Sequence, residues 1–299
     1  HTPFTCAPLF AAETQLDDGT PVLRLYEFER VRAMPYQMDF FLPDGSPVLF
    51  LRVRLRNPHP YTVPVYWWSN MAVPEAPDVR ILVPADHVYR FAYETHRLEL
   101  VPHPYFDGAD RSRPTQIPKA CDSFYRVPDE LPWPWIASVD GSGRGVFQIS
   151  TAALRGRKLF VWGQSHLGAK WQRFLNPATG EPYVEIQAGL EPTQASCQPL
   201  KAGDTIEWLE AYGLLETDPT IAHGKDWQMA RRHAEDRIHD VIGPETLDRL
   251  LATTAPMVDR PPQLVRHAEG WGALENLRRR ADGEPALPAS MPFPETSLG

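Results

Sequence analysis

Residues 158–194 have the sequence KLFVWGQSHLGAKWQRFLNPATGEPYVEIQAGLEPTQ, and this stretch predicts two strands joined by a long loop. Side chains alternate between the faces of a strand, so Tyr183, Glu185 and Gln187 share one face of the second strand. One face of the first strand carries two rings and an amide: Phe160, Trp162 and Gln164. Aromatic rings among amides and a carboxylate suit a polar, ring-shaped ligand such as a sugar. The alternative is an ordinary polar outer face with scattered aromatic side chains.

The composition indicates a globular protein. The chain has 299 residues, enough for one large domain or two smaller ones, and 42% of them are hydrophobic. The formal net charge is -8 and no basic run marks a nucleic-acid-binding face, so we expect no nucleic acid partner. No apolar run approaches the length of a membrane span, so we expect no membrane partner.

The three cysteines, Cys6, Cys121 and Cys197, are odd in number and include no CxxC pair. They argue against a disulfide framework and a structural zinc site, and they favour a reduced, cytoplasmic environment. The sequence contains no GxSxG motif, no Walker loop and no GxGxxG motif, so we expect no cofactor and no metal. The chain begins at His1 without Met and without a signal-peptide pattern, so we expect a fragment, a processed chain or a missing N-terminal segment.

Strand patterns follow one another from about Val22 to Leu215, separated by Pro, Gly, Asn and Asp turn signals. This spacing favours a large antiparallel sandwich over a parallel α/β fold. The predicted strands are 23–30, 48–57, 63–72, 80–83, 135–139, 145–150, 158–164, 182–188 and 204–214. Residues 89–134 lose this period, and we expect a long functional or mobile loop there.

The segment 48–57, VLFLRVRLRN, alternates strictly between two kinds of side chain. We expect its aliphatic face to be core: Leu49, Leu51, Val53 and Leu55. The opposite face carries Arg52, Arg54 and Arg56, which we expect to be solvated or to pair across strands.

The pattern changes after Glu216. Apolar residues recur at helical spacing in 226–241, and helices are also predicted at 245–254 and 272–280. We therefore divide the chain into a β-sandwich domain, residues 1–216, and a helical extension with a Pro-rich linker, residues 217–299.

Two glutamates are candidate catalytic residues. Glu185 lies between Tyr183 and Gln187 and can serve as a general base, or it can simply pair with an arginine. Glu210 shares a strand face with Trp208 and Tyr212. If Glu210 lies near Glu185, the two carboxylates can carry out glycoside cleavage; otherwise Glu210 is a structural residue.

Further side chains are candidates for binding a sugar, each with core packing or simple exposure as the alternative. These substrate-binding candidates are Trp68, Asn70, Trp162, Gln164, His166, Trp171, Gln187 and Gln194. The loop histidine His166 can also act as an acid.

Five runs of the sequence together resemble the DUF5107 family, bacterial domains that often precede tetratricopeptide repeats. The runs are 65–75, VYWWSNMAVPE; 155–164, RGRKLFVWGQ; 171–172, WQ; 183–194, YVEIQAGLEPTQ; and 210–213, EAYG. The resemblance implies a galactose-mutarotase-like β-supersandwich, a fold used by aldose epimerases and by domains of glycoside hydrolases and polysaccharide lyases. It also implies that the first strands of the domain precede His1, and that tetratricopeptide repeats follow.

The mutarotases suggest roles for particular residues. Their base is a Glu in a Glu-x-Gln setting, which Glu185 and Gln187 match. Their acid is a His in a strand that residues 68–72, WSNMA, resemble without containing a His. An acid would then come from His1, from sequence before it, or from another carboxylate.

Three hypotheses follow from the sequence. The first is an enzyme acting on a carbohydrate, as a glycoside hydrolase or an aldose-epimerase-like enzyme, with Glu185 as acid or base. The second is a non-catalytic carbohydrate-binding module coupled to a tetratricopeptide array. The third is a structural or interaction domain, possible also as a homo-oligomer, that kept the fold but not the site.

Overall fold

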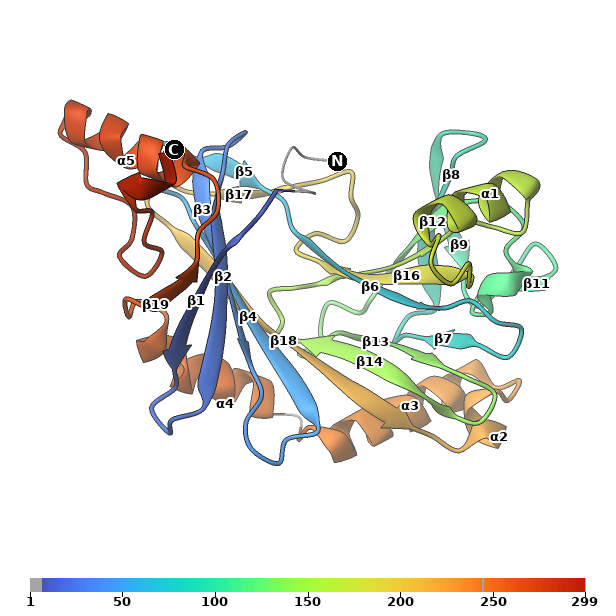
Figure 1. Cartoon of the computed structure of the whole chain (residues 1–299). Helices are drawn as coiled ribbons and strands as arrows, with labels where there is room; N and C mark the ends of the chain where they lie inside the picture. Colours follow the sequence, from blue (N-terminus) through green and yellow to red (C-terminus); the bar gives the residue numbers. More distant parts are fainter. Residues whose placement is uncertain (1–6, 244, 299) are drawn as a thin grey trace. The chain divides into compact units, whose positions relative to one another are not determined.

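The computed structural model describes residues 7–243 and 245–298, and the chain forms two compact units (Figure 1). The first unit contains the chain up to Val65, Gln198–Ala211 and the chain from Glu245 onward. The second contains Tyr66–Cys197 and the chain from Tyr212 onward to residue 243. Strand β18 (Thr205–Glu216) contributes its beginning to the first unit and its end to the second.

The first unit is built on antiparallel strands in the order β19-β1-β2-β3-β4. Their bounds are β1 Phe10–Gln15, β2 Pro21–Glu29, β3 Met34–Phe41, β4 Val48–Arg56 and β19 Gln263–Arg266. Two short strands form a separate ladder: β5 Val63–Val65 and β17 Gln198–Leu200. The helical elements of this unit are α4 Thr246–Thr253, η2 Ala255–Met257, α5 Trp271–Asp282 and η3 Glu295–Leu298.

A buried arginine ties the C-terminal segments to this sheet. Arg24 of β2 forms two hydrogen bonds with the carboxylate of Asp39, at 2.6 and 3.1 Å. Its guanidinium also donates to the backbone carbonyls of Arg260 (2.9 Å) and Ser290 (3.1 Å). Because a buried charge is tolerated only with such partners, the position of these two segments depends on Arg24.

Strand β4 is covered on both faces, which alters the pattern predicted for it. Arg52 is buried and its Nε donates to Glu207 Oε2 of β18 at 3.0 Å, so this arginine pairs across strands. Leu49, predicted as core, is 39% exposed, whereas Phe50 on the arginine face is buried. Alternation identifies the core only where one face of a strand meets solvent, and here both faces are packed.

The second unit contains a six-stranded antiparallel sheet in the order β6-β16-β15-β12-β8-β9. Its strands are β6 Trp68–Pro74, β8 His87–Ala92, β9 Arg97–Pro102, β12 Cys121–Tyr125, β15 Gly156–Val161 and β16 Tyr183–Gly189. A second group pairs β14 with β13 and β13 with β7: β7 Arg80–Leu82, β13 Trp135–Val139 and β14 Arg144–Ser150. The remaining elements are β10 Tyr105–Phe106, β11 Ala109–Asp110, η1 Pro114–Gln116, α1 His166–Leu175, α2 Pro219–Ala222 and α3 Trp227–Val241.

The loops of the second unit converge on another buried arginine. Arg80 Nη1 donates to the carbonyls of Ala222 (2.9 Å) and Gly224 (2.8 Å), where α2 ends. Its guanidinium carbon lies 5.4 Å from the ring centroid of Trp227, at the start of α3. Arg80 thus fixes both helices relative to β7.

The three predicted C-terminal helices are confirmed as α3, α4 and α5, and the mainly β, antiparallel class is confirmed as well. The predicted boundary between domains 1–216 and 217–299 stays a prediction; α2 and α3 belong to the second unit, and α4 and α5 to the first. Among the described residues, none of the helices is both long and apolar enough to cross a membrane.

Three local predictions are wrong. Residues 63–72 form two strands, β5 and β6, instead of one. Residues 89–134, predicted as a loop, contain β9, β12 and most of β8. These strands are short, and several Pro residues lie between β9 and β12, which hid their period. The loop predicted within residues 158–194 contains helix α1, whose start is capped by Ser165 Oγ accepting from Gly168 N at 3.1 Å.

A buried glutamate in the first unit predicts pH-dependent stability. Burial raises the pKa of Glu27 to about 7, and its Oε1 accepts the backbone N–H of Phe28 at 2.8 Å. Between the ordinary pKa and about 7 the folded protein binds the proton more tightly than the unfolded chain, so stability falls as the pH rises through this range.

We expect Glu27→Gln to match the wild type in stability below pH 4.5 and to exceed it at pH 8, by up to about 3 kcal/mol, because the amide never carries the buried charge. Urea unfolding at both pH values measures this difference. An equal difference at the two pH values would show that Glu27 does not titrate as its burial requires.

Candidate functional site

The predicted carboxylate and amides lie on one face of the six-stranded sheet. Directly opposite residues in an antiparallel pair share a face. Gln187 of β16 lies opposite Asn70 of β6 and opposite Lys158 of β15, and Glu185 lies opposite Phe160. The other face of β16 is buried in the core through Val184, Ile186 and Ala188. The predicted alternation of this strand is therefore present in the structure.

A chain of hydrogen bonds, which we call the polar row, joins four predicted residues and one unpredicted lysine. Glu185 Oε2 accepts from Asn70 Nδ2 (2.7 Å) and from Gln187 Nε2 (3.0 Å). Gln187 Oε1 accepts from Gln194 Nε2 (3.1 Å), and Gln194 Oε1 accepts from Lys158 Nζ (2.8 Å). Residues from three strands and one loop therefore form a single polar network.

The polar row ends in a buried ion pair that sequence reasoning missed. Lys158 Nζ lies 2.6 Å from Asp122 Oδ1, and both side chains are buried. Asp122 Oδ2 accepts from the hydroxyl of Tyr93 at 2.8 Å. Burial, with Asp122 beside it, raises the pKa of Tyr93, so its hydroxyl stays a donor. The signal in the sequence was a lysine two residues before Phe160 in a strand otherwise rich in apolar residues.

The lysine at one end of the row and the carboxylate at the other determine the direction of its hydrogen bonds. An ammonium only donates, so Gln194 must turn its carbonyl oxygen to Lys158 and its NH₂ to Gln187. Gln187 must then donate to Glu185. Among the described residues, none donates a hydrogen bond to Glu185 Oε1, and the side chain is half-buried. This oxygen is therefore available to a ligand.

Aromatic side chains border the polar row. The ring of Trp162 lies 4.7 Å from Phe160, 6.2 Å from Tyr183 and 6.5 Å from Trp171, measured between centroids. Tyr93 lies 6.4 Å from Phe160 and extends this contact chain to β8. We call this group the aromatic cluster: Phe91, Tyr93, Phe160, Trp162, Trp171 and Tyr183.

Helix α1, which carries Trp171, is fixed to the sheet by a buried carboxylate. Glu75 accepts one hydrogen bond from Gln164 Nε2 and another from Gln172 Nε2, each at 2.6 Å. Burial raises the pKa of Glu75, and the two amide bonds act in the opposite direction. A Cβ at Gly168 would lie 2.3 Å from the backbone oxygen of Gly163, so the helix contacts the chain there closely. Gln164, predicted to bind substrate, thus has its amide nitrogen engaged with Glu75.

Trp68 occupies the other end of the same face. Its side chain is half-buried, and its ring lies 5.9 Å from that of Phe124. A Cβ added at Gly189 would approach the indole to 2.3 Å, and one added at Gly156 would approach it to 2.8 Å. The indole therefore rests on two glycines of neighbouring strands, and any larger residue at position 189 would displace it.

The other predicted residues lie apart from this network. His166 is exposed at the first residue of α1. Glu210 belongs to the first unit, is fully buried and accepts from Trp208 Nε1 at 2.9 Å, and its pairing with Glu185 stays a prediction. His1 lies outside the described residues. In the described part of the chain, no group of three or more His, Cys, Asp or Glu side chains is placed to hold a metal ion.

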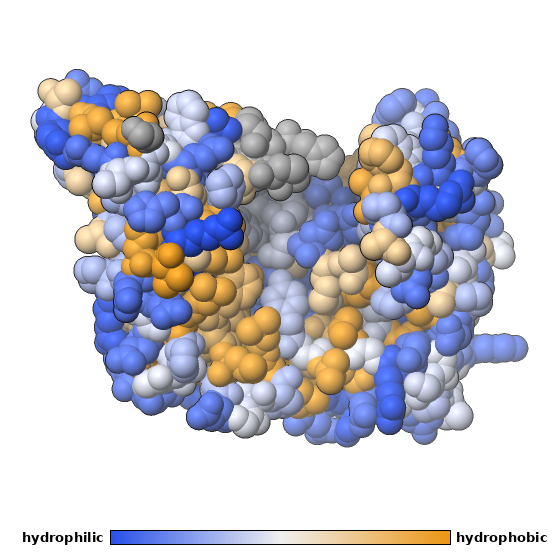
Figure 2. All heavy atoms as spheres, in the orientation of Figure 1, coloured by the Kyte–Doolittle hydropathy of each residue, from blue (hydrophilic) through white to orange (hydrophobic). Residues whose placement is uncertain are grey.

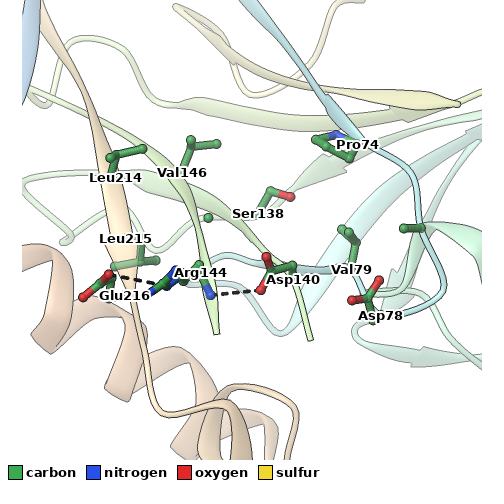
Figure 3. A pocket seen from close by; sticks show the side chains of 12 residues that line it. Pro74, Asp78, Val79, Ser138, Asp140, Arg144, Val146, Leu214, Leu215 and Glu216 are labelled. Atoms are coloured by element: carbon green, nitrogen blue, oxygen red, sulfur yellow. Dashed lines mark hydrogen bonds and ion pairs between the residues drawn. The ribbon is translucent and has the colours of Figure 1, made fainter. Parts of the chain in front are cut away.

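The second unit also has an open pocket of about 710 Å³ on another surface (Figure 3). Leu214 and Val146 point into it from β18 and β14. Charged groups that line the pocket interact with one another. Asp140 accepts from the backbone N–H of Arg144 (3.1 Å), and Arg144 Nε lies 3.6 Å from Glu216 Oε1. These groups are engaged with one another, so we place the candidate site at the polar row.

Removing one member of the buried ion pair should destabilise the protein. We expect Lys158→Met to cost about 3–5 kcal/mol in unfolding free energy, because Asp122 would remain as an unpaired buried charge. Replacing both residues, Lys158→Met with Asp122→Leu, should recover most of this loss. Urea unfolding at pH 7 measures both variants, and a cost below about 1 kcal/mol for the single change would contradict the pairing.

Comparison with known proteins places these observations in a family. The model of a domain of unknown function (DUF5107) matches residues 1–205. Among solved structures, a TPR-domain containing protein from Parabacteroides distasonis is 23% identical with a TM-score of 0.62, over 72% of this chain and 36% of that chain. A galactose mutarotase-like protein from Clostridium acetobutylicum is 10% identical with a TM-score of 0.49, over 70% of this chain and 66% of that chain. At these identities the likeness concerns the fold alone.

The predicted fold class is confirmed as a mainly β fold of antiparallel sheets with helices towards the C-terminus. The chain spans about a third of the length of the Parabacteroides distasonis protein, with 36% covered. Because the family model covers more than half of the chain, this protein is a member of the DUF5107 family.

Proposed function

We propose that the polar row and the aromatic cluster bind a sugar or glycoside, and that Glu185 acts on it as an acid–base group. The observation that carries this proposal is the half-buried Glu185 carboxylate, oriented by two amide donors, beside a group of contacting rings. Sugar hydroxyls both donate and accept hydrogen bonds, as the amides and carboxylate of the row require. The apolar C–H face of a sugar ring suits an aromatic ring such as Trp162.

A second carboxylate on the same face supports hydrolysis. Asp122, Phe160 and Glu185 lie opposite one another on three neighbouring strands. At ordinary strand spacing, the Cα atoms of Asp122 and Glu185 are about 10 Å apart. Glycosidases canonically use a pair of carboxyl groups at the scissile bond. Lys158 forms an ion pair with this second carboxylate, and Tyr93 donates a hydrogen bond to it.

We also propose that the chain works beside a tetratricopeptide array. The Parabacteroides distasonis protein is a TPR-domain containing protein whose chain is longer than the matched region, which supports this proposal. The intact mass of the native protein, with peptide mapping beyond residue 299, tests it. The predicted homo-oligomer and the cytoplasmic location stay predictions.

Replacing Glu185 should separate binding from turnover. We expect the wild-type protein to gain thermal stability with a binding sugar and to release product from the matching glycoside. Glu185→Gln should keep the thermal shift and lose turnover by at least about 100-fold, the usual contribution of general acid–base catalysis. The measurement combines thermal shift with product analysis over a panel of sugars and glycosides.

Glu181→Gln is the matched control, because Glu181 is exposed and lies two residues before β16. It should behave as the wild type. Undiminished turnover in Glu185→Gln would remove Glu185 from the chemistry. Binding without turnover in every variant would identify a non-catalytic sugar-binding module. The absence of any response to any sugar would overturn the carbohydrate proposal.

A further inference from the structure

We infer that the ligand of this face is a neutral chain of several sugar rings, with one ring at the polar row and the next on the indole of Trp171. This inference rests on the proposed function of the same face. It concerns the length and charge of the ligand, which the proposed function leaves open.

The ligand-facing surface extends beyond the polar row in both directions. Trp68 lies opposite Gly189 at one end of β16, and Tyr183 lies at its other end. Six residues of strand correspond to about 20 Å. The polar row occupies the middle of this length, and Trp162 and Trp171 continue the surface beyond Tyr183. One sugar ring at Glu185 would leave most of this surface uncovered.

The aromatic cluster is exposed at its outer end. Trp171 is 46% exposed, although it lies against Trp162. On the same helix, Leu167 is 61% exposed and Phe174 is 70% exposed. Figure 2 shows hydrophobic side chains at the surface where α1 lies in Figure 1, among hydrophilic ones. Single exposed apolar residues are common, but several on one short helix, continuous with a candidate site, indicate a binding surface.

Helix α1, which carries the outer end of this surface, is held in place. Glu75 accepts from Gln164 before the helix and from Gln172 within it, and Gly168 brings the helix backbone against the end of β15. The indole of Trp171 is therefore presented by an anchored helix and not by a free loop. A binding surface that is ordered before the ligand arrives loses less entropy on binding.

The charge of the row indicates the chemical class of the ring that it binds. Glu185 and Asp122 supply two carboxylates, and Lys158 supplies one ammonium. The ammonium is already paired with Asp122 and Gln194, so it is not available to an anionic ligand. A uronic acid or a phosphorylated sugar would meet the remaining charge of Glu185 at short range. A neutral sugar avoids this repulsion.

The test is calorimetric titration with sugars of increasing length. The probes are glucose, galactose, mannose and N-acetylglucosamine, together with their neutral β-1,4- and α-1,4-linked oligomers of two to five units. Oligomers of galacturonic acid are the acidic probes. We expect the affinity of the wild-type protein to rise at least tenfold from one to four units in one neutral series, with no comparable rise for the acidic oligomers.

Two variants test whether helix α1 provides the gain in affinity with increasing ligand length. Trp171→Ala should bind every length with the affinity of the single sugar, and Glu75→Gln, which removes one acceptor oxygen that anchors α1, should reduce the gain. Tyr105→Ala is the matched control: this tyrosine is exposed, belongs to the same unit and lies outside the aromatic cluster. It should keep the full gain.

Affinity that is equal for one to five units in every series, with single sugars still bound, would overturn this inference and leave the proposed function in place. A full gain retained by Trp171→Ala would overturn it as well. Preference for the acidic oligomers would overturn the neutral class. If no sugar of any length binds, the proposed function itself fails, and the inference fails with it.

Discussion

The buried ammonium of Lys158 is the constraint on which the candidate site depends. Because it can only donate, it fixes the orientation of Gln194, and Gln194 fixes that of Gln187. The two neutral amides are thus oriented in sequence, so that the N–H group of Gln187 donates to the carboxylate of Glu185. Burial of Lys158 and Gln187 strengthens the bonds that they form and makes an unpaired member there costly. The row is therefore one connected network, in which the orientation of each glutamine amide depends on its neighbours.

The side chains of one strand were predictable, and their neighbours across the sheet were not. The two-residue period placed Tyr183, Glu185 and Gln187 on one face, as β16 shows. The period of β16 does not indicate which residues of β12 and β8 lie on the same face of the sheet. In addition, β12 and most of β8 come from the region predicted as a loop. Asp122 and Tyr93 were therefore missed. A cross-strand partner is determined by register, which a single sequence contains only weakly.

Helix α1 shows a second limit of sequence reasoning. Its apolar side chains recur at helical spacing, but they are exposed, so the usual link between such a pattern and a buried face does not hold. Trp171 was predicted as a ligand-binding residue without the element that positions it. Gln164 was assigned to the ligand, although its amide nitrogen anchors the helix through Glu75. Side-chain type indicated the region of the site. Which of these side chains face outward and which hold the helix in place is seen only in the structure.

The indole of Trp68 resting on Gly189 and Gly156 has a consequence for engineering this protein. A side chain added at Gly189 alone would collide with the indole, and removal of the indole of Trp68 alone would leave a void. Directed evolution that varies one codon at a time would record Trp68 and Gly189 as intolerant. A library that varies these two positions together could replace the ring and reshape this end of the sheet, whereas a side chain at Gly156 would still collide with the backbone oxygen of Glu191.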